Sequence, residues 1–71
     1  NKFIVYPNPT KDEIMVKSDV PFLNYFIIDQ NGKSLFHGAI TNKEKTIDVS
    51  TLTNGVYFIK LENQAYKFIK E

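Results

Sequence analysis

The chain has 71 residues, a formal net charge of +1 and no cysteine. A chain of this length forms one domain with a small core, and without cysteine it has neither a disulfide nor a thiolate ligand for a metal. All nine basic residues are Lys, so the planar guanidinium group that suits phosphates and guanine edges is absent. We therefore expect no nucleic-acid partner. We also expect no membrane span, because the sequence has no run of about 18 apolar residues.

Three short strands are predicted in the first part of the chain. Lys2–Tyr6 is mainly apolar and ends at Pro7-Asn8-Pro9, whose prolines lack backbone donors. Glu13–Ser18 alternates apolar and polar residues, which is typical of a half-buried strand. After the interruption at Asp19-Val20-Pro21, Phe22–Asp29 is apolar at nearly every position. That composition predicts a strand that is covered on both faces.

A hairpin is predicted at Gln30-Asn31-Gly32-Lys33, since an Asn-Gly pair between two apolar runs is a strong hairpin signal. Ser34–Ile40 should then return antiparallel to Phe22–Asp29. The polar and charged residues Thr41–Lys45 are expected to form a loop.

The stretch Thr46–Leu61 predicts a strand, a turn and a second strand. Ile47 and Val49 alternate with polar residues before a break from Ser50 to Gly55. Val56–Leu61 is apolar on both faces, so we place it in the middle of a sheet. Asn54-Gly55 is the expected pivot, because both residue types tolerate a positive φ. A second tight turn is expected at Asn63-Gln64, followed by a last strand over Ala65–Lys70.

The predicted fold class is all-β. Six to seven short strands without helical periodicity favour a small Ig-like antiparallel β-sandwich, in which two sheets bury their apolar faces against each other. Residues 1–71 are expected to form a single domain. The abrupt start at Asn1 suggests a fragment of a larger secreted protein.

The residues that usually carry chemistry are sparse. The single histidine, His37, lies in a predicted strand and lacks the partners that a metal site or a nucleophilic triad requires. Asp29-Gln30-Asn31-Gly32 is similar to the start of a calcium-binding loop, but the twelfth position is Ile40 instead of Glu. We therefore expect no catalytic residue, no cofactor and no metal, and we interpret the chain as a protein without enzymatic activity.

Two motifs stand out, Tyr6-Pro7-Asn8-Pro9-Thr10 and Ile47-Asp48-Val49-Ser50-x-Leu52-x-x-Gly55-Val56-Tyr57-Phe58. Both resemble a known family, the C-terminal sorting domain of proteins exported by the type IX secretion system (type A, Por secretion system family). The hairpin Phe26-Ile27-Ile28-Asp29-x-x-Gly32-Lys33 and the closing strand Lys67-Phe68-Ile69-Lys70 are also similar to that family. The match covers essentially the whole chain.

The resemblance implies a source in the Bacteroidetes and a role as an address label. It implies that a covalently attached N-terminal cargo domain travels through the periplasm, is recognised at the type IX translocon and reaches the cell surface or the medium. It also implies that a sortase-like protease removes the tail near Asn1 and that the cargo is joined to lipopolysaccharide.

The candidate residues for recognition by the translocon come from three places. The first is the Tyr6–Thr10 turn, the second is the loop before Gly55, and the third is the strand Tyr66–Lys70. If that strand lies at a sheet edge, its backbone could accept a strand from a partner. The individual candidates are Tyr6, Pro7, Asn8, Pro9, Gly55, Lys67 and Lys70.

An alternative function is a carbohydrate-binding or spacer module appended to a secreted enzyme or adhesin. The chain has no Trp, and most Phe and Tyr residues fall at strand positions that are expected to be buried. Both observations disfavour carbohydrate binding.

Overall fold

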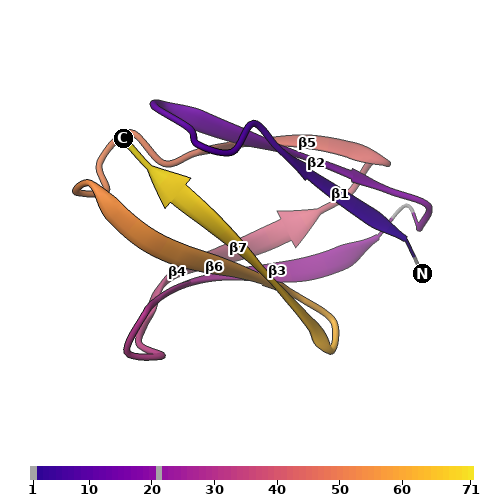
Figure 1. Cartoon of the computed structure of the whole chain (residues 1–71). Coiled ribbons are helices and arrows are strands. Elements are labelled where there is room, and N and C mark those ends of the chain that lie inside the picture. Colours follow the sequence, from indigo (N-terminus) through magenta and orange to yellow (C-terminus); the bar gives the residue numbers. More distant parts are fainter. Residues whose placement is uncertain (1, 21) are drawn as a thin grey trace.

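A computed structural model describes residues 2–20 and 22–71, and this part of the chain forms seven strands and no helix. The strands are β1 (Phe3–Tyr6), β2 (Glu13–Ser18), β3 (Leu23–Asp29), β4 (Ser34–Ile40), β5 (Glu44–Asp48), β6 (Gly55–Leu61) and β7 (Gln64–Lys70). They pair antiparallel in two sheets, with the orders β1-β2-β5 and β4-β3-β6-β7, and the sheets lie face to face (Figure 1). The predicted β-sandwich is confirmed.

The core lies between the inner faces of the two sheets, because alternate side chains of each strand point toward it. In β2, Ile14 and Val16 have no exposed surface, and in β6 Ile59 and Leu61 have none either. β6 lies between β3 and β7, which confirms the prediction of a central strand. The other buried apolar residues are Phe3, Leu23, Tyr25, Ile27, Ile40, Ile47, Val49, Tyr57 and Phe68.

The prediction that Phe22–Asp29 is covered on both faces is wrong. In β3 buried and exposed positions alternate, and the Phe26 side chain is 41% exposed on the outer face. Phe22 lies before the strand and is also exposed. A two-layered sandwich gives each sheet only one covered face, so an apolar run in such a sheet places some of its large side chains in solvent.

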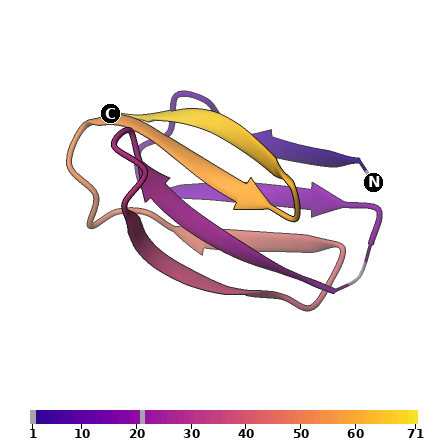
Figure 2. The same cartoon turned by 90° about the horizontal axis from the view of Figure 1, so that it is seen from below.

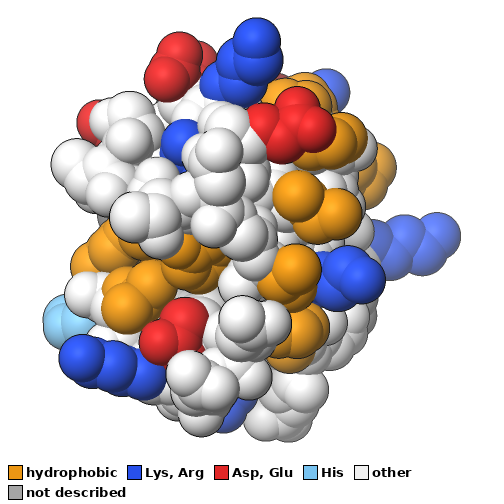
Figure 3. All heavy atoms as spheres, turned by 60° about the vertical axis from the view of Figure 1, so that its left-hand side comes forward, with side chains coloured by type: hydrophobic (Ala, Val, Ile, Leu, Met, Phe, Trp, Pro, Cys, Tyr) orange, Lys and Arg blue, Asp and Glu red, His pale blue; other side chains and the backbone are white. Residues whose placement is uncertain are grey.

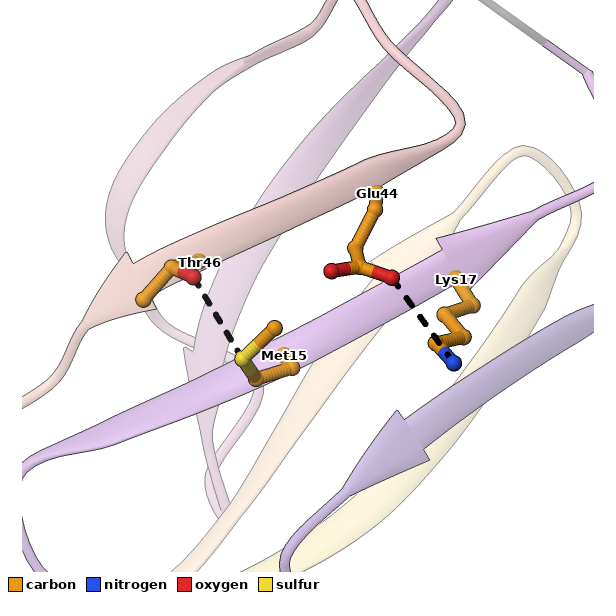
Figure 4. A network of polar contacts seen from close by, with 4 residues as sticks. All are labelled: Met15, Lys17, Glu44 and Thr46. Atoms are coloured by element: carbon orange, nitrogen blue, oxygen red, sulfur yellow. Dashed lines mark hydrogen bonds and ion pairs between the residues drawn. The ribbon is translucent and has the colours of Figure 1, made fainter.

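The charged segment Thr41–Lys45 is not wholly a loop, because β5 begins at Glu44. Glu44 pairs with Lys17 of β2, and Lys17 Nζ lies 3.7 Å from a Glu44 carboxylate oxygen (Figure 4). Beside them the Thr46 hydroxyl donates to Met15 Sδ at 3.4 Å. Both charged side chains are about half exposed, with side-chain values of 52% and 55%, so their pair contributes at most about 1 kcal/mol. Charge on the solvent face of a strand does not prevent pairing.

The predicted β3–β4 hairpin is confirmed, and Gly32 has a φ of +85°. Gly32 N donates to Asp29 O at 3.0 Å, and Asp29 N donates to Lys33 O at 3.0 Å. The Asp29 carboxylate also accepts from the backbone amides of Asn31 and Lys33, both at 2.9 Å. Asp29 therefore holds the turn together, which is a common use of this residue type.

The last hairpin turns one residue earlier than predicted. Leu61 pairs with Gln64, so Glu62 and Asn63 form the turn, and Glu62 has a φ of +55°. The prediction of a turn at Asn63-Gln64 was one residue late, because the left-handed position of the turn is occupied by Glu62, a residue type that does not signal a turn. At the start of β6, Gly55 has a φ of +156°. The expected break at Pro21 and the expected junction near Asn1 lie outside the described residues.

Four chain segments lie at the same end of the sandwich. They are the β1–β2 connection, the β3–β4 hairpin, the loop before β6 and the end of β7 (Figure 1). β1 begins at the opposite end, as the view from below also shows (Figure 2). The sequence motifs at the start and at the end of the chain are thus brought to the same part of the surface.

Candidate functional site

The Tyr6–Thr10 turn begins the connection from β1 to β2 and is hydrogen-bonded to the end of β7. The peptide bonds Tyr6-Pro7 and Asn8-Pro9 are both cis, and Pro7, Asn8 and Pro9 are exposed. Because neither proline has a backbone N–H, the turn offers few backbone donors of its own. Its hydrogen bonds to β7 come from the side chain of Asn8 and from the backbone of Thr10.

The Asn8 side chain bonds to the outer edge of β7. Its Oδ1 accepts from Ile69 N at 3.0 Å, and its Nδ2 donates to Lys67 O at 3.3 Å. An amide has one acceptor and a donor in one plane, as a peptide group has. Asn8 therefore occupies the place of a peptide group from a neighbouring strand.

Thr10 continues this contact with its backbone. Thr10 N donates to Ile69 O at 2.8 Å, and Thr10 O accepts from Glu71 N at 2.8 Å, which makes a short parallel bridge to the end of β7. The side chain is 2% exposed, and its hydroxyl donates to Glu13 O at 2.5 Å. Thr10 thus fixes the turn both to β7 and to the start of β2.

The last strand lies at a sheet edge, which is the condition for strand addition, but along its second half this edge is not free. β7 is the outer strand of the four-stranded sheet. Of its outward backbone groups, Lys67 O and Ile69 N are bonded to the Asn8 side chain, and Ile69 O is bonded to Thr10 N. Just beyond the strand, Glu71 N is bonded to Thr10 O. A partner strand would have to displace the turn.

The loop before Gly55 is hydrogen-bonded to the β1–β2 connection. Val49 N donates to Asp12 O at 2.9 Å, and Leu52 N donates to Val49 O at 3.1 Å. The hydroxyl of buried Tyr57 donates to Thr53 O at 2.7 Å and lies 3.1 Å from the Thr53 hydroxyl. The loop is therefore tied to the β1–β2 connection at one side and to β6 at the other.

Asp48 stabilises the start of this loop. Ser50 N donates to the Asp48 carboxylate at 2.8 Å. Hydrogen bonds from the Ser50 side chain and backbone lower the pKa of Asp48 below its usual value, because they stabilise the charged form. The carboxylate is at the surface, so its charge remains in contact with water.

An open groove of about 660 Å³ lies beside the turn. Apolar lining comes from Tyr6, Pro7, Pro9 and Met15, and the Lys17 ammonium lies 5.8 Å from the centre of the Tyr6 ring. The remaining lining residues are polar or charged, namely Thr10, Lys11, Asp12, Glu13 and Glu71. Figure 3 shows this end of the molecule, where hydrophobic side chains gather in patches with charged side chains between them. Such a mixed, open surface suits a protein segment better than a deeply held small molecule.

The structure brings most of the predicted recognition residues together. Gly55 pairs with Lys70 in the β6–β7 register, and Lys70 is bridged to Thr10 of the turn. Lys70 itself is only 7% exposed, and its Nζ donates to Glu71 O at 3.2 Å. Lys67 is exposed and pairs with Phe58, three residues before Lys70 at the end of β7. A role in recognition stays a prediction for all seven residues.

Sequence reasoning missed the part that Thr10, Asp12 and Val49 play in joining the three segments. Their contacts are made through backbone groups, which carry no residue-specific signal. Asn8 was singled out as a candidate for recognition by the translocon, and its bonding partners in β7 lie 59 and 61 residues away in the sequence. The one sequence signal for these hydrogen bonds is the position of Asn8 between two prolines, where the side chain is the main source of donors and acceptors.

His37 lies on β4, as expected, and is exposed; its ring centre is 5.7 Å from that of Phe26. In the described part of the chain, no group of three or more His, Asp or Glu residues could hold a metal ion. Residues 2–20 and 22–71 also contain no helix of the length and hydropathy that a membrane crossing requires.

The aromatic residues are less buried than predicted. Phe3, Tyr25, Tyr57 and Phe68 are buried, whereas Phe22 is 71% exposed and Phe26 is exposed too. The remaining aromatic residues, Tyr6, Phe36, Phe58 and Tyr66, are half-buried. The outer face of a sandwich accounts for this, because it leaves alternate strand positions uncovered.

Comparison with known proteins gives a family and a fold. The family model described as the secretion system C-terminal sorting domain matches residues 4–71. No curated protein sequence matches the chain. The crystal structure of a single-mutant thermostable endoglucanase from Alicyclobacillus acidocaldarius is similar, with a TM-score of 0.67 at 10% sequence identity. That likeness covers 97% of this chain and 14% of the endoglucanase chain, and at this identity it concerns the fold alone.

Proposed function

Since the chain belongs to the family of C-terminal sorting domains of the type IX secretion system, we propose that it is read as one composite surface at the end of the sandwich where the two family motifs meet. As a member of this family it is a sorting signal for export across the outer membrane, to the cell surface or the medium. The open question is which part of the domain the secretion machinery contacts.

The observation that carries the proposal is the set of bonds that fastens three distant segments together. Asn8 and Thr10 bond to the end of β7, and Asp12 bonds to the loop before Gly55. Each segment alone is short, and a short segment would lose conformational entropy on binding. Fastened together they form a rigid surface, and a rigid surface loses less entropy when a partner docks.

Within this surface we assign contact to Tyr6, Pro7, Pro9 and Lys67. Tyr6, Pro7 and Pro9 line the groove, and Lys67 adds an exposed cation on the neighbouring strand. Asn8, Gly55 and Lys70 support them, because Asn8 holds the turn, Gly55 allows the bend into β6, and Lys70 is largely buried. The partner is a protein component of the type IX translocon.

The later steps are proposed in the same way. The cargo domain is attached at the N-terminal side of the chain and passes through the periplasm before the tail is read. A sortase-like protease then removes the tail, and the cargo is joined to lipopolysaccharide. These steps follow the family's role and use no residue of the described surface as a catalyst.

The test is an export assay with the 71-residue chain fused behind a periplasmic fluorescent reporter. The fusion is produced in a type IX-competent bacterium and in a translocon-deficient strain of the same species. Reporter at the surface or in the medium only in the competent strain would support the proposal. Reporter retained in the periplasm of both strains, with the domain shown to be folded, would contradict it.

The second outcome would lead back to the alternative of a carbohydrate-binding or spacer module. The exposed rings of Phe22 and Phe26 would then be the first positions to examine in a glycan screen, because stacking on sugars needs accessible aromatic faces. The fold likeness to part of an endoglucanase chain does not favour either function.

A further inference from the structure

The two sheets have four outer strands, and three of them are protected against pairing with another chain. The second half of β7 is covered by Asn8 and Thr10. β5 carries Glu44 and Lys45, and charged residues on an edge strand disfavour pairing. β1 has only four residues and is followed by Pro7, so it offers a short edge.

β4 is the exception. Its sequence, SLFHGAI, contains neither Lys, Glu, Asp nor Pro. It is the outer strand on the other side of the four-stranded sheet. A register shift opposite Ile27 and Ile28 marks a bulge near Leu35, which bends the start of the strand away. The regular part of the open edge is therefore Phe36–Ile40.

The backbone groups that face outward on β4 follow from the pairing register. Asp29 N donates toward β4, and in antiparallel sheets alternate residues bond to opposite neighbours. Tyr25 and Ile27 therefore also bond toward β4, and their partners Gly38 and Phe36 point inward. The outward N–H and C=O groups are those of His37 and Ala39.

Tyr25 adds a polar group to this edge. Its hydroxyl lies over Gly38, so close that a Cβ at position 38 would be 2.7 Å from the oxygen. Among the described residues the hydroxyl has no hydrogen-bond partner, yet no buried side-chain oxygen is unsatisfied. The Tyr25 hydroxyl therefore reaches solvent beside the open edge, where it is free to bond to a chain that pairs with β4.

We propose that the β4 edge is a docking site for a second copy of this chain, which pairs antiparallel with β4 about a two-fold axis at Gly38. In this register His37 of each copy lies opposite Ala39 of the other, and each such pair exchanges two N–H···O bonds. The register uses both outward residues and avoids the bulge, whereas an axis at His37 would place Ala39 opposite the bulge at Leu35.

The charge pattern favours an identical partner. A two-fold axis brings like side chains close together, and β4 has no charged side chain that would repel its own copy. The two Gly38 residues meet at the axis and leave room for the two Tyr25 hydroxyls. An interface of one strand from each copy is small, so the dimer belongs to the weak, transient class. This inference does not depend on the sorting role.

The experiment measures self-association of the 71-residue chain and of two matched variants. Ala39→Pro removes an outward N–H of β4, and Ala65→Pro changes the same residue type in β7, at the opposite edge. By the same alternation the Ala65 backbone faces outward, since Lys67 O and Ile69 do. Pro is tolerated on an edge strand when its missing N–H would face solvent. Both variants should therefore remain folded, as circular dichroism would show.

The wild-type chain is expected to shift from monomer toward dimer in sedimentation velocity between about 10 μM and about 1 mM, as suits a weak interface. Ala39→Pro should weaken the dimer about tenfold or more through its lost bonds, and Ala65→Pro should leave it unchanged. In the wild-type chain, the amide NMR signals of His37 and Ala39 should move with concentration.

Three results would overturn the proposal. The first is a wild-type chain that stays monomeric at every concentration, which would leave the β4 edge to a segment of another protein. The second is a folded Ala39→Pro variant that dimerises as well as the wild type. The third is an equal loss of dimer affinity in Ala39→Pro and Ala65→Pro. If Ala39→Pro does not fold, Ala39→Lys replaces it, with Ala65→Lys as its control. A lysine at position 39 places a charge at the edge and should abolish the dimer by the same argument.

Discussion

Asn8 shows how one side chain can take the place of a strand. Its amide bonds to Ile69 N and Lys67 O, the groups that a neighbouring strand would otherwise use. A bare edge is a liability because it can pair with other chains. The prolines on both sides of Asn8 limit its backbone to a few conformations, so less entropy is lost when the amide reaches β7.

Replacing Asn8 by Ala should therefore lower the free energy of unfolding by about 1 to 2 kcal/mol, since two hydrogen bonds at the surface are lost. Hydrogen exchange at the Ile69 amide should accelerate. Asn8→Asp is the matched control, because it keeps an acceptor for Ile69 N but loses the donor to Lys67 O, and its effect should be intermediate. An unchanged exchange rate at Ile69 in the Ala variant would contradict this account.

Asp48 predicts a dependence of stability on pH. Its folded pKa is lowered by the Ser50 hydrogen bonds, so its contribution is present above the pKa of the unfolded chain and is lost as the pH falls through the folded pKa. Asp48→Asn keeps the side-chain oxygen but not the charge. Denaturant unfolding should show a difference between wild type and variant at neutral pH that begins to shrink as the pH falls below about 4 and disappears below the folded pKa of Asp48. A difference that is the same at every pH would point to geometry instead of charge.

At the scale of elements, the hairpin between β3 and β4 depends on one backbone conformation. Gly32 has a φ of +85°, and a Cβ built there meets no atom within 4 Å. Any penalty for a larger residue at this position therefore comes from the backbone and not from a clash. The Asp29 carboxylate, which accepts from the amides of Asn31 and Lys33, supports the same turn.

Gly32→Val should reduce the free energy of unfolding by about 1 to 3 kcal/mol, because a β-branched residue is strained at positive φ. Gly32→Asn should cost clearly less, since Asn tolerates this region. Thermal unfolding of the two variants beside the wild type is the measurement. Equal melting temperatures for the Val and Asn variants would show that strain at φ is not the cause.

At the scale of the whole molecule, the candidate recognition surface requires the fold. Phe68 has no exposed surface, and the turn is bonded to the strand that carries it. Deletion of Tyr66–Glu71 would therefore unfold the domain and abolish export without identifying a contact. Single substitutions of exposed residues are more informative.

Lys67→Glu should reduce export of the reporter fusion about tenfold, which corresponds to a loss of about 1.4 kcal/mol in binding to the translocon. Lys60→Glu is the matched control, since Lys60 is also an exposed lysine of the four-stranded sheet but lies outside the candidate surface. Surface fluorescence, normalised to the amount of folded fusion, is the readout. Equal export of the two variants would remove Lys67 from the recognition surface.

The sequence by itself determined the strands, most of the turns and the family. Alternation in Glu13–Ser18, the Asn31-Gly32 turn and the two motifs are local patterns, and local patterns depend on neighbours within a few residues. The sequence did not determine which faces are covered, so Phe26 was expected to be buried and is exposed. Nor could it show that Asn8 closes the edge of β7 while β4 stays open. Those outcomes depend on how strands far apart in the chain are ordered into sheets and how the sheets pack, and only the tertiary structure decides this.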